Sequence, residues 1–273
     1  ILLIFISVII SFLLTGFIYK YYKKHNFIDI PEGRNLHDQP VVTGGGISIV
    51  VLNIFGLIYY NISIIFIIPI ILISILGFID DKINLHPLIR ILFHFLCSYF
   101  IIIWIEGFPI LDFGLFIIDN IYIRNILGII FISWFINLYN FMDGSDGFAT
   151  LESIFISLSL LVIINLLLIN LVQNDSLFIY PLLLINSGAC MGFLFLNYPN
   201  ARIFMGDQGS VFLGLYLISI SLYIVNSSIV SIWTILILYG LFFIDATITL
   251  FRRFLYGQKW YLPHRSHWYQ RFI

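Results

Sequence analysis

Long apolar runs alternate with short polar islands along the whole chain. A helix that crosses a bilayer needs about 20 mostly apolar residues, with a range of about 17–25. On that template the chain contains about nine spans, and the pattern predicts a polytopic helix bundle. The predicted spans cover residues 1–19, 47–60, 64–79, 88–105, 126–138 with part of its N-terminal flank, 151–172, 177–196, 211–225 and 229–251.

Residues 106–125 interrupt this pattern with proline, glycine and acidic residues between short apolar stretches. Such a segment is typical of a small hairpin or re-entrant loop. Hydrophobic residues make up 61% of the chain, charged residues make up 10%, and the mean hydropathy is +1.05. A soluble domain carries about 25% charged residues. We therefore expect an all-α integral membrane protein with a single membrane-embedded domain over residues 1–273. Because the chain begins inside an apolar run and stops after a polar motif, we expect both ends to be truncated.

The basic residues are distributed unevenly between the two sides that nine passes define. Twelve of the thirteen Lys and Arg residues fall on the side that holds residues 20–43, and Arg124 falls on the other. Basic residues collect in cytoplasmic loops, so we expect the polar islands in the cytoplasm and residues 106–125 in the periplasm. The net charge of −1 and the lack of a basic patch with interleaved aromatic residues give no indication of a nucleic-acid partner.

The most informative polar island is residues 137–150, NLYNFMDGSDGFAT, between two predicted spans. Asn140, Asp143 and Asp146 recur every three residues, which would bring them to neighbouring positions on a helical turn. Acidic residues at a membrane boundary cost free energy unless a cation, a partner or water satisfies them. A glycine-rich turn with one capping Asp explains one carboxylate, but it does not explain two carboxylates with an asparagine.

Residues 77–90 form a second acidic island, in which Asp80 and Asp81 end a predicted span. Adjacent carboxylates suit Mg²⁺, which takes one or two carboxylates and fills its shell with phosphates and water. A solvated helix end paired with a neighbouring lysine is an equally good interpretation of this pair alone. Arg90 and His94 share a helix face and are candidates to anchor a phosphate.

Asp207 lies in the island of residues 197–210, at the start of a predicted span. It is a candidate N-terminal cap and a candidate metal ligand, and the two interpretations are compatible. Phe204 in the same island is by residue type more often a packed aromatic than a platform for a nucleotide base.

The remaining two islands are rich in basic and histidine side chains. In residues 29–46, Arg34 and His37 can donate to anionic phosphate oxygens, although a basic loop that touches lipid head groups fits as well. A cationic cluster in residues 252–272 can neutralise a diphosphate from the face opposite a metal. That cluster consists of His264, Arg265 and His267.

Five ordered motifs along nearly the whole chain resemble those of the polyprenyl-phosphate N-acetylhexosamine-1-phosphate transferases, glycosyltransferase family 4. This family includes the phospho-MurNAc-pentapeptide translocase and the initiating enzymes of O-antigen and teichoic-acid synthesis. Together the motifs are highly specific, although each alone is weak. They read DIPEGRNLHDQP-x-x-TGGG, GFIDD, NFMDGSDG, NYPNARIFMGD-x-GS and HRSHWYQ.

The resemblance implies a bundle of ten or eleven helices in the bacterial inner membrane, with its active site on the cytoplasmic face. It implies transfer of a sugar 1-phosphate from a UDP-sugar to undecaprenyl phosphate, with release of UMP. The implied cofactor is Mg²⁺, with Mn²⁺ as an alternative. The protein partners are left open by the sequence, and a homodimer is one option.

The resemblance also assigns expected roles to the motif residues. Asp207 resembles the direct Mg²⁺ ligand, and Asp80 and Asp81 resemble residues that line the metal and lipid-phosphate site. The remaining expectations are polar contacts to the nucleotide sugar from Asn140, Asp143 and Asp146, uridine contacts from Asn197 and Phe204, and a catalytic histidine motif at His264 and His267.

The C-terminal motif is HRSH, where the translocase branch has a contiguous histidine cluster. The chain therefore looks more like the O-antigen-initiating branch, which serves lipopolysaccharide synthesis. A cation-coupled membrane transporter is the alternative from another functional class. It requires carboxylates near the bilayer midplane, and Asp245 is the main residue that it could use.

Overall fold

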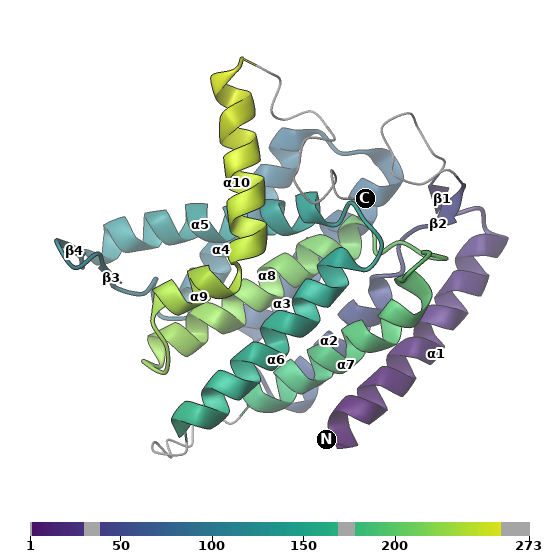
Figure 1. Ribbon diagram of the computed structural model, residues 1–273, viewed down its shortest axis with the longest axis horizontal. Helices are drawn as coiled ribbons and strands as arrows, with labels where there is room; N and C mark the ends of the chain where they lie inside the picture. Colours follow the sequence, from purple (N-terminus) through teal and green to yellow (C-terminus); the bar gives the residue numbers. More distant parts are fainter. Residues whose placement is uncertain (1, 30–38, 169–177, 258–273) are drawn as a thin grey trace.

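The computed structural model describes residues 2–29, 39–168 and 178–257. Within these ranges the chain forms a bundle of ten α-helices with two short antiparallel strand pairs (Figure 1). The elements are α1 (Leu2–Lys24), β1 (Ile28–Asp29), β2 (Val41–Val42), α2 (Ile47–Tyr59), α3 (Ile64–Ile83), α4 (Pro87–Trp104), β3 (Leu111–Asp112), β4 (Ile117–Ile118), α5 (Ile121–Met142), α6 (Phe148–Leu168), α7 (Ile179–Asn197), α8 (Asp207–Asn226), α9 (Ile232–Leu238) and α10 (Gly240–Leu255).

The predicted all-α polytopic membrane fold is confirmed. In the described ranges seven helices are long and apolar enough to cross a membrane, or up to eight if the bent pair α9–α10 forms one span. Helix α2 is apolar but has only 13 residues, which is shorter than the usual spanning length. Each of the nine apolar runs of the sequence therefore corresponds to a helix or to the bent pair.

Helix α8 is the centre of the bundle. Of the span Asp207–Asn226, 94% is buried inside the protein, whereas only 22% of α1 is buried. Small residues along α8 let its neighbours approach closely: a Cβ on Gly214 would lie 2.9 Å from Cβ of Tyr139 on α5. The peripheral helices turn apolar side chains outward, as expected for a surface that faces lipid.

Helices α1 and α7 pack with almost no space between their backbones. A Cβ on Gly192 of α7 would lie 2.4 Å from the carbonyl oxygen of Val8 on α1. The Ser11 hydroxyl on α1 donates a 2.6 Å hydrogen bond to the carbonyl oxygen of Ala189. Small residues with hydrogen bonds between helices are a usual way to join helices in a membrane, where the hydrophobic effect gives no attraction between them.

A buried polar network joins α2, α6 and α7 in the bundle interior. Asn186 on α7 donates to the hydroxyls of Ser153 and Ser157 on α6, both at 2.9 Å. The side-chain amide of Asn53 on α2 donates to Oδ1 of Asn186 at 3.2 Å. These hydrogen bonds link three helices, and Oδ1 of Asn53 is buried without a hydrogen-bond partner among the described residues.

The predicted hairpin within residues 106–125 is present as the pair β3–β4. Helix α5 begins at Ile121, within the N-terminal flank that the prediction added to residues 126–138 without fixing where it starts. The reason is Asn120, whose Oδ1 accepts hydrogen bonds from the backbone N–H groups of Tyr122 and Ile123 and so caps the helix.

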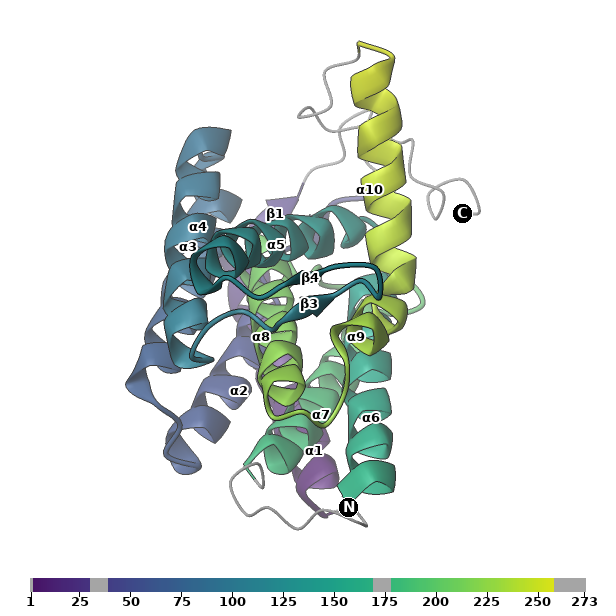
Figure 2. The same cartoon turned by 90° about the vertical axis from the view of Figure 1, so that its left-hand side faces the viewer.

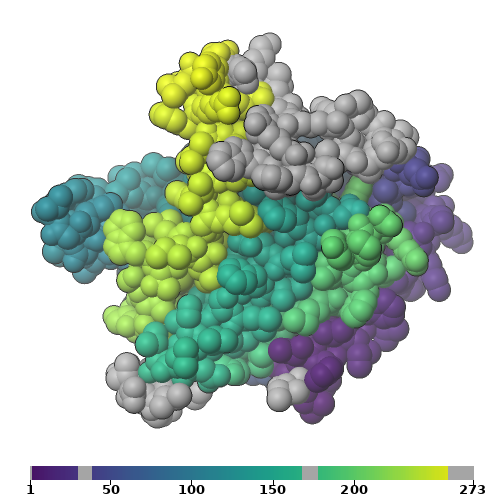
Figure 3. All heavy atoms as spheres, in the orientation of Figure 1, coloured from purple at the N-terminus to yellow at the C-terminus, as the bar shows by residue number. Residues whose placement is uncertain are grey.

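The last predicted span, residues 229–251, is a bent pair of helices. Helices α9 and α10 meet at an angle of 77°, and α10 stands out from the bundle (Figures 2 and 3). Tyr239 lies at the bend, with its hydroxyl 3.0 Å from that of Ser221 on α8. Gly240 follows, and glycine favours a helix less than other residues do. An anchored tyrosine followed by glycine therefore ends one helix and starts another.

Candidate active site

Three helix ends bring the predicted acidic residues together at one end of α8. Asp80 and Asp81 lie in the last turn of α3, Asn140 lies in the last turn of α5, and Asp143 is the C-cap residue of α5. Asp207 is the first residue of α8. The islands that are far apart in the sequence therefore form one acidic cluster, which we define as Asp80, Asp81, Asp143 and Asp207.

Asp81 joins α3 to the N-terminus of α8. Its Oδ1 accepts the backbone N–H of Asp207 at 2.8 Å, and its Oδ2 accepts the backbone N–H of Gln208 at 3.2 Å. The interpretation of Asp207 as the N-terminal cap is wrong in detail, because the N-cap residue is Gly206 and the capping carboxylate comes from Asp81. Gly206 has φ +74, and a Cβ on it would lie 2.7 Å from Oδ2 of Asp81. Only glycine fits this contact.

Asp80 is buried and fully engaged with other protein groups. Its Oδ1 accepts the backbone N–H of Leu85 at 2.7 Å, and its Oδ2 accepts from the guanidinium of Arg90 at 3.0 Å. The same Arg90 nitrogen lies 3.9 Å from Oδ2 of Asp207. Among the described residues, Arg90 therefore balances part of the negative charge of the acidic cluster.

Arg90 and His94 lie one turn apart on α4, as the sequence predicted, and their joint role as a phosphate anchor stays a prediction. His94 is buried, and its Nδ1 lies 3.0 Å from the side-chain amide nitrogen of Asn137. Pro87 starts α4, so Arg90 falls in the first turn, close to the end of α3. In the sequence, the short connection between Asp80 and Arg90 was the feature that could have predicted their contact.

Asn140 holds the side chain of Asp207 in place. Its Nδ2 donates to Oδ1 of Asp207 at 2.8 Å and to the hydroxyl of Ser210 at 3.0 Å. Ser210 is a site residue that the sequence did not single out, although it lies one turn after Asp207. Oδ2 of Asp207 faces Arg90 and remains accessible for a further interaction, because the side chain is 33% exposed.

Asp143 carries the least compensated charge of the acidic cluster. Burial, and then the nearby carboxylates of Asp207 and Asp81, raise the pKa of Asp143 well above its ordinary value. Its electrostatic neighbours among the described residues are thus like charges. A cation bound between these carboxylates would remove that repulsion.

Asp146 does not share a helical turn with Asn140 and Asp143, as the three-residue spacing had predicted. Helix α5 ends at Met142, and Asp146 lies in the following loop. There its Oδ2 accepts the backbone N–H of Ala201 at 2.8 Å. Helix α5 ends before Asp146, the third residue of the pattern, so the spacing of three residues does not place Asp146 on the helix.

Asn197 ties two loops of the site together. Its Oδ1 accepts the backbone N–H of Gly147 at 3.0 Å, and its Nδ2 donates to the carbonyl oxygen of Ile203 at 3.0 Å. These contacts indicate a positioning role. The predicted contact of Asn197 with uridine stays a prediction.

Phe204 lies in a segment that pairs with the glycine-rich start of α2. Its backbone N–H donates to the carbonyl oxygen of Val42 at 2.7 Å, and its carbonyl accepts from Gly45 at 2.9 Å. The first and fourth polar islands thus meet beside the acidic cluster. The role of the Phe204 ring in binding uridine stays a prediction, and Arg34, His37, His264, Arg265 and His267 lie outside the described residues.

The donor set of the acidic cluster fits Mg²⁺. The described residues contain no group of three or more His, Cys, Asp or Glu side chains arranged around a metal position. Mg²⁺ does not require such a cage, because it binds through one or two carboxylates and keeps waters or phosphates in its other positions. Both oxygens of Asp80 and of Asp81 accept hydrogen bonds, and Oδ1 of Asp207 accepts one from Asn140. Each carboxylate oxygen has a second lone pair, so all four carboxylates of the acidic cluster stay candidate ligands.

The sequence profile of glycosyl transferase family 4 matches residues 63–225, which is more than half of the chain. The chain belongs to glycosyl transferase family 4. The matched region runs from the start of α3 to the end of α8 and contains the whole acidic cluster. The family expected from the five motifs is thereby confirmed.

Several curated members of glycosyl transferase family 4 are similar to this chain. A Bacillus subtilis (strain 168) protein described as a probable undecaprenyl-phosphate N-acetylglucosaminyl 1-phosphate transferase is 28% identical over 98% of this chain and 75% of its own length. A Thermotoga maritima undecaprenyl-phosphate alpha-N-acetylglucosaminyl 1-phosphate transferase is 30% identical over 77% of this chain and 61% of its own length. A Prochlorococcus marinus phospho-N-acetylmuramoyl-pentapeptide-transferase is 33% identical over 77% of this chain and 60% of its own length.

These relatives of the family 4 chain act in more than one branch of the family, as their descriptions show. The chain spans about three fifths of the length of the second and third relatives. The predicted assignment to the O-antigen-initiating branch therefore stays a prediction.

Proposed function

We propose that this protein transfers an N-acetylhexosamine 1-phosphate from a UDP-sugar to undecaprenyl phosphate, giving undecaprenyl-diphospho-sugar and UMP. The observation that carries the proposal is the acidic cluster with Arg90, at the meeting point of the ends of α3, α5 and α8. Relatives described as transferases of sugar phosphate to a prenyl phosphate support it. The distribution of Lys and Arg supports a cytoplasmic position of the cluster in the bacterial inner membrane.

The proposed reaction is an in-line displacement at phosphorus. An oxygen of the lipid phosphate forms a bond to the sugar-linked phosphorus of the UDP-sugar, the bond from that phosphorus to the UMP oxygen breaks, and UMP leaves with the electron pair. A phosphate monoester with a second pKa of about 6 is largely dianionic at neutral pH. The lipid nucleophile therefore needs no dedicated general base.

The residues of the chain bind and orient in this proposal. Asp207 and Asp143 would hold Mg²⁺, with Mn²⁺ as an alternative, and the ion would supply positive charge to offset that of the diphosphate and the leaving UMP. Asn140 fixes the carboxylate of Asp207 through their 2.8 Å hydrogen bond. Arg90 donates hydrogen bonds to phosphate oxygens of the substrates. Asp80 orients the guanidinium of Arg90 for this contact.

Asp81 has a positioning role in this proposal because its two oxygens cap α8. Asp146 and Asn197 hold the loops that border the nucleotide-sugar site. The cationic residues that the sequence predicted for phosphate binding lie outside the described ranges, and in this proposal they complete the phosphate contacts. The enzyme acts as a monomer or a homodimer.

The test is UMP release by the full-length protein in detergent with undecaprenyl phosphate and a panel of UDP-sugars, with Mg²⁺ or with EDTA. We expect release that requires the lipid, the metal and one class of sugar. Asp207→Asn should reduce the rate at least about a hundredfold, because it removes one charge from the site that stabilises the leaving group. Glu106→Gln is the matched control, since it removes one charge from an exposed residue far from the cluster.

Full activity of Asp207→Asn would contradict the proposed site. A lack of UMP release with every sugar, while a control enzyme is active, would contradict the reaction and direct attention to cation-coupled transport. In that alternative Asp245 would be the residue to test. It lies on α10, and its Oδ1 accepts from the hydroxyl of Thr249 at 3.2 Å.

A further inference from the structure

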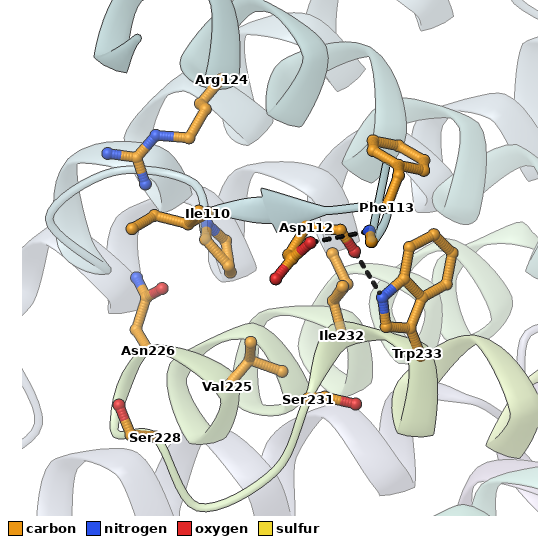
Figure 4. A pocket seen from close by; sticks show the side chains of 12 residues that line it. Ile110, Asp112, Phe113, Arg124, Val225, Asn226, Ser228, Ser231, Ile232 and Trp233 are labelled. Atoms are coloured by element: carbon orange, nitrogen blue, oxygen red, sulfur yellow. Dashed lines mark hydrogen bonds between the residues drawn. The ribbon is translucent and has the colours of Figure 1, made fainter. Parts of the chain in front are cut away.

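A second cavity lies at the other end of α8, away from the acidic cluster. It has a volume of about 780 Å³ and lies between the β3–β4 hairpin and the turn that joins α8 to α9 (Figure 4). Ligand pockets in proteins have volumes of about 300–1,000 Å³ and combine apolar walls with a few polar groups. This cavity has both, with Ile110, Phe113, Val225 and Ile232 as apolar walls and Asp112, Arg124, Asn226 and Ser231 as polar groups.

Side-chain hydrogen bonds hold the walls of this cavity in place. The indole nitrogen of Trp233 donates to the carbonyl oxygen of Asp112 at 2.9 Å, which joins α9 to the hairpin. The amide of Asn226, at the end of α8, donates to the carbonyl oxygens of Ile105 at 2.7 Å and Gly107 at 2.8 Å. These hydrogen bonds fix the positions of the hairpin, the end of α8 and α9 around the cavity.

The position of the cavity relative to a bilayer follows from α8. This helix has 20 residues, and at 1.5 Å per residue it extends about 30 Å, the thickness of the hydrocarbon core. If the acidic cluster lies at one membrane surface, the cavity lies at the other. The hairpin tip beside the cavity is apolar and exposed, with Leu115 96% and Phe116 57% exposed. Apolar and aromatic side chains at this level contact lipid at the membrane interface.

Two opposite charges face the same cavity. The guanidinium of Arg124 donates to the carbonyl oxygens of Phe108 at 2.6 Å and Asp119 at 3.1 Å, and it lies 3.7 Å from Oδ1 of Asp119. A guanidinium has five N–H donors, so donors remain for a ligand. The carboxylate of Asp112 points into the cavity (Figure 4), and one of its oxygens accepts the backbone N–H of Gly114 at 2.7 Å.

A ligand that satisfies both charges in one cavity must carry an anion and a cation on the same molecule. A phosphodiester joined to a primary ammonium has this pattern, whereas a purely anionic head group would meet repulsion from Asp112. We propose that the cavity binds the head group of phosphatidylethanolamine from the leaflet opposite the acidic cluster. Arg124 binds its phosphate, Asp112 binds its ammonium, and its acyl chains lie along the apolar hairpin tip.

The test compares lipid retention by three forms of the delipidated full-length protein. Each is mixed with phosphatidylethanolamine and phosphatidylglycerol of identical acyl chains, and bound lipid is counted by native mass spectrometry. Asp112→Asn removes the charge but keeps the acceptor for Gly114 and the backbone contact to Trp233, so the hairpin is preserved. Glu106→Gln is the matched control, because it removes a charge from the same segment without lining the cavity.

We expect wild type and Glu106→Gln to retain phosphatidylethanolamine in preference to phosphatidylglycerol. Asp112→Asn should lower that preference about two- to fivefold, which is the range for a partly exposed ion pair. Arg124→Lys should weaken the binding of both lipids and keep their ratio, because both carry the phosphate. Soluble phosphoethanolamine should displace the bound lipid.

An equal ratio of the two lipids in wild type and Asp112→Asn would overturn the proposal. So would bound lipid that soluble phosphoethanolamine does not displace, since the acyl chains alone would then account for binding. Melting temperatures of the three forms check that the variants are folded. The readout is lipid retention, so the result does not depend on the proposed transferase activity.

Discussion

The contact between α1 and α7 allows a sharp prediction for Gly192→Ala. The new Cβ would lie 2.4 Å from the carbonyl oxygen of Val8 and 2.6 Å from Cβ of Ser11. Carbon atoms in contact prefer about 3.5–4.0 Å, so the helices must separate locally by roughly 1 Å. Both clashing groups belong to α1 itself, and the nearer one is backbone, which cannot rotate away.

The expected cost has two parts. Overpacking of a close contact costs about 1–3 kcal/mol, and the separation weakens the hydrogen bond from Ser11 to Ala189, which contributes about 0.5–1.5 kcal/mol. Together they predict a loss of about 1.5–4.5 kcal/mol and a fall in melting temperature of roughly 3–18 °C. The measurement is thermal unfolding of the purified protein in detergent.

Gly16→Ala is the matched control, because no atom lies within 4 Å of a Cβ on Gly16. Alanine favours a helix more than glycine does, so this variant should melt at the same or a slightly higher temperature. Gly192 lies five residues before Asn197, which holds two loops of the candidate site. UMP release should therefore fall in Gly192→Ala at a temperature where the protein is still folded. Equal melting temperatures for the two variants would refute the packing argument.

Three further predictions concern the site and the bundle interior. Arg90→Gln should lower UMP release at least about tenfold and destabilise the protein by about 1–3 kcal/mol, because the buried carboxylate of Asp80 loses its charged partner; unchanged turnover would remove Arg90 from the site. Asn186→Leu should cost about 1–2 kcal/mol in thermal unfolding, since hydrogen bonds between membrane helices average about 0.6 kcal/mol, while the Mg²⁺ dependence of UMP release stays the same. Because the pKa of Asp143 is raised, the folded protein without Mg²⁺ holds a proton there that the unfolded chain has released at any pH between the raised pKa and the ordinary carboxyl pKa of about 4, so its melting temperature should rise as pH falls from the raised pKa towards about 4. Asp143→Asn or saturating Mg²⁺ should flatten that pH dependence, and an unchanged slope in Asp143→Asn would contradict the assignment.

The sequence predicted the spans well because a bilayer imposes a simple requirement of length and polarity. It was incomplete where a single polar contact outweighs that requirement. Asn120 caps α5 and so fixes a start that the prediction had left open, and Tyr239 with Gly240 breaks the last apolar run into two helices. Hydropathy averages over such residues and carries no information about the direction of a helix.

The site was predicted in composition but not in the division of roles. Asp80 and Asp81 are identical neighbours in the sequence, yet one orients Arg90 and the other caps α8. That difference arises from which neighbouring helix each side chain meets. The same applies to Asp146, which the period-three pattern placed with Asp143 and which instead binds the backbone of Ala201.

The cap that Asp81 forms on α8 decides which kind of ion this end of the bundle attracts. An open helix N-terminus offers free N–H groups and a positive partial charge, and it commonly receives a phosphate. Here a carboxylate of the protein already fills that position. The polarity of the helix end is thereby reversed, so a phosphate must bind there through a cation, such as Arg90 or a metal ion, instead of through the backbone.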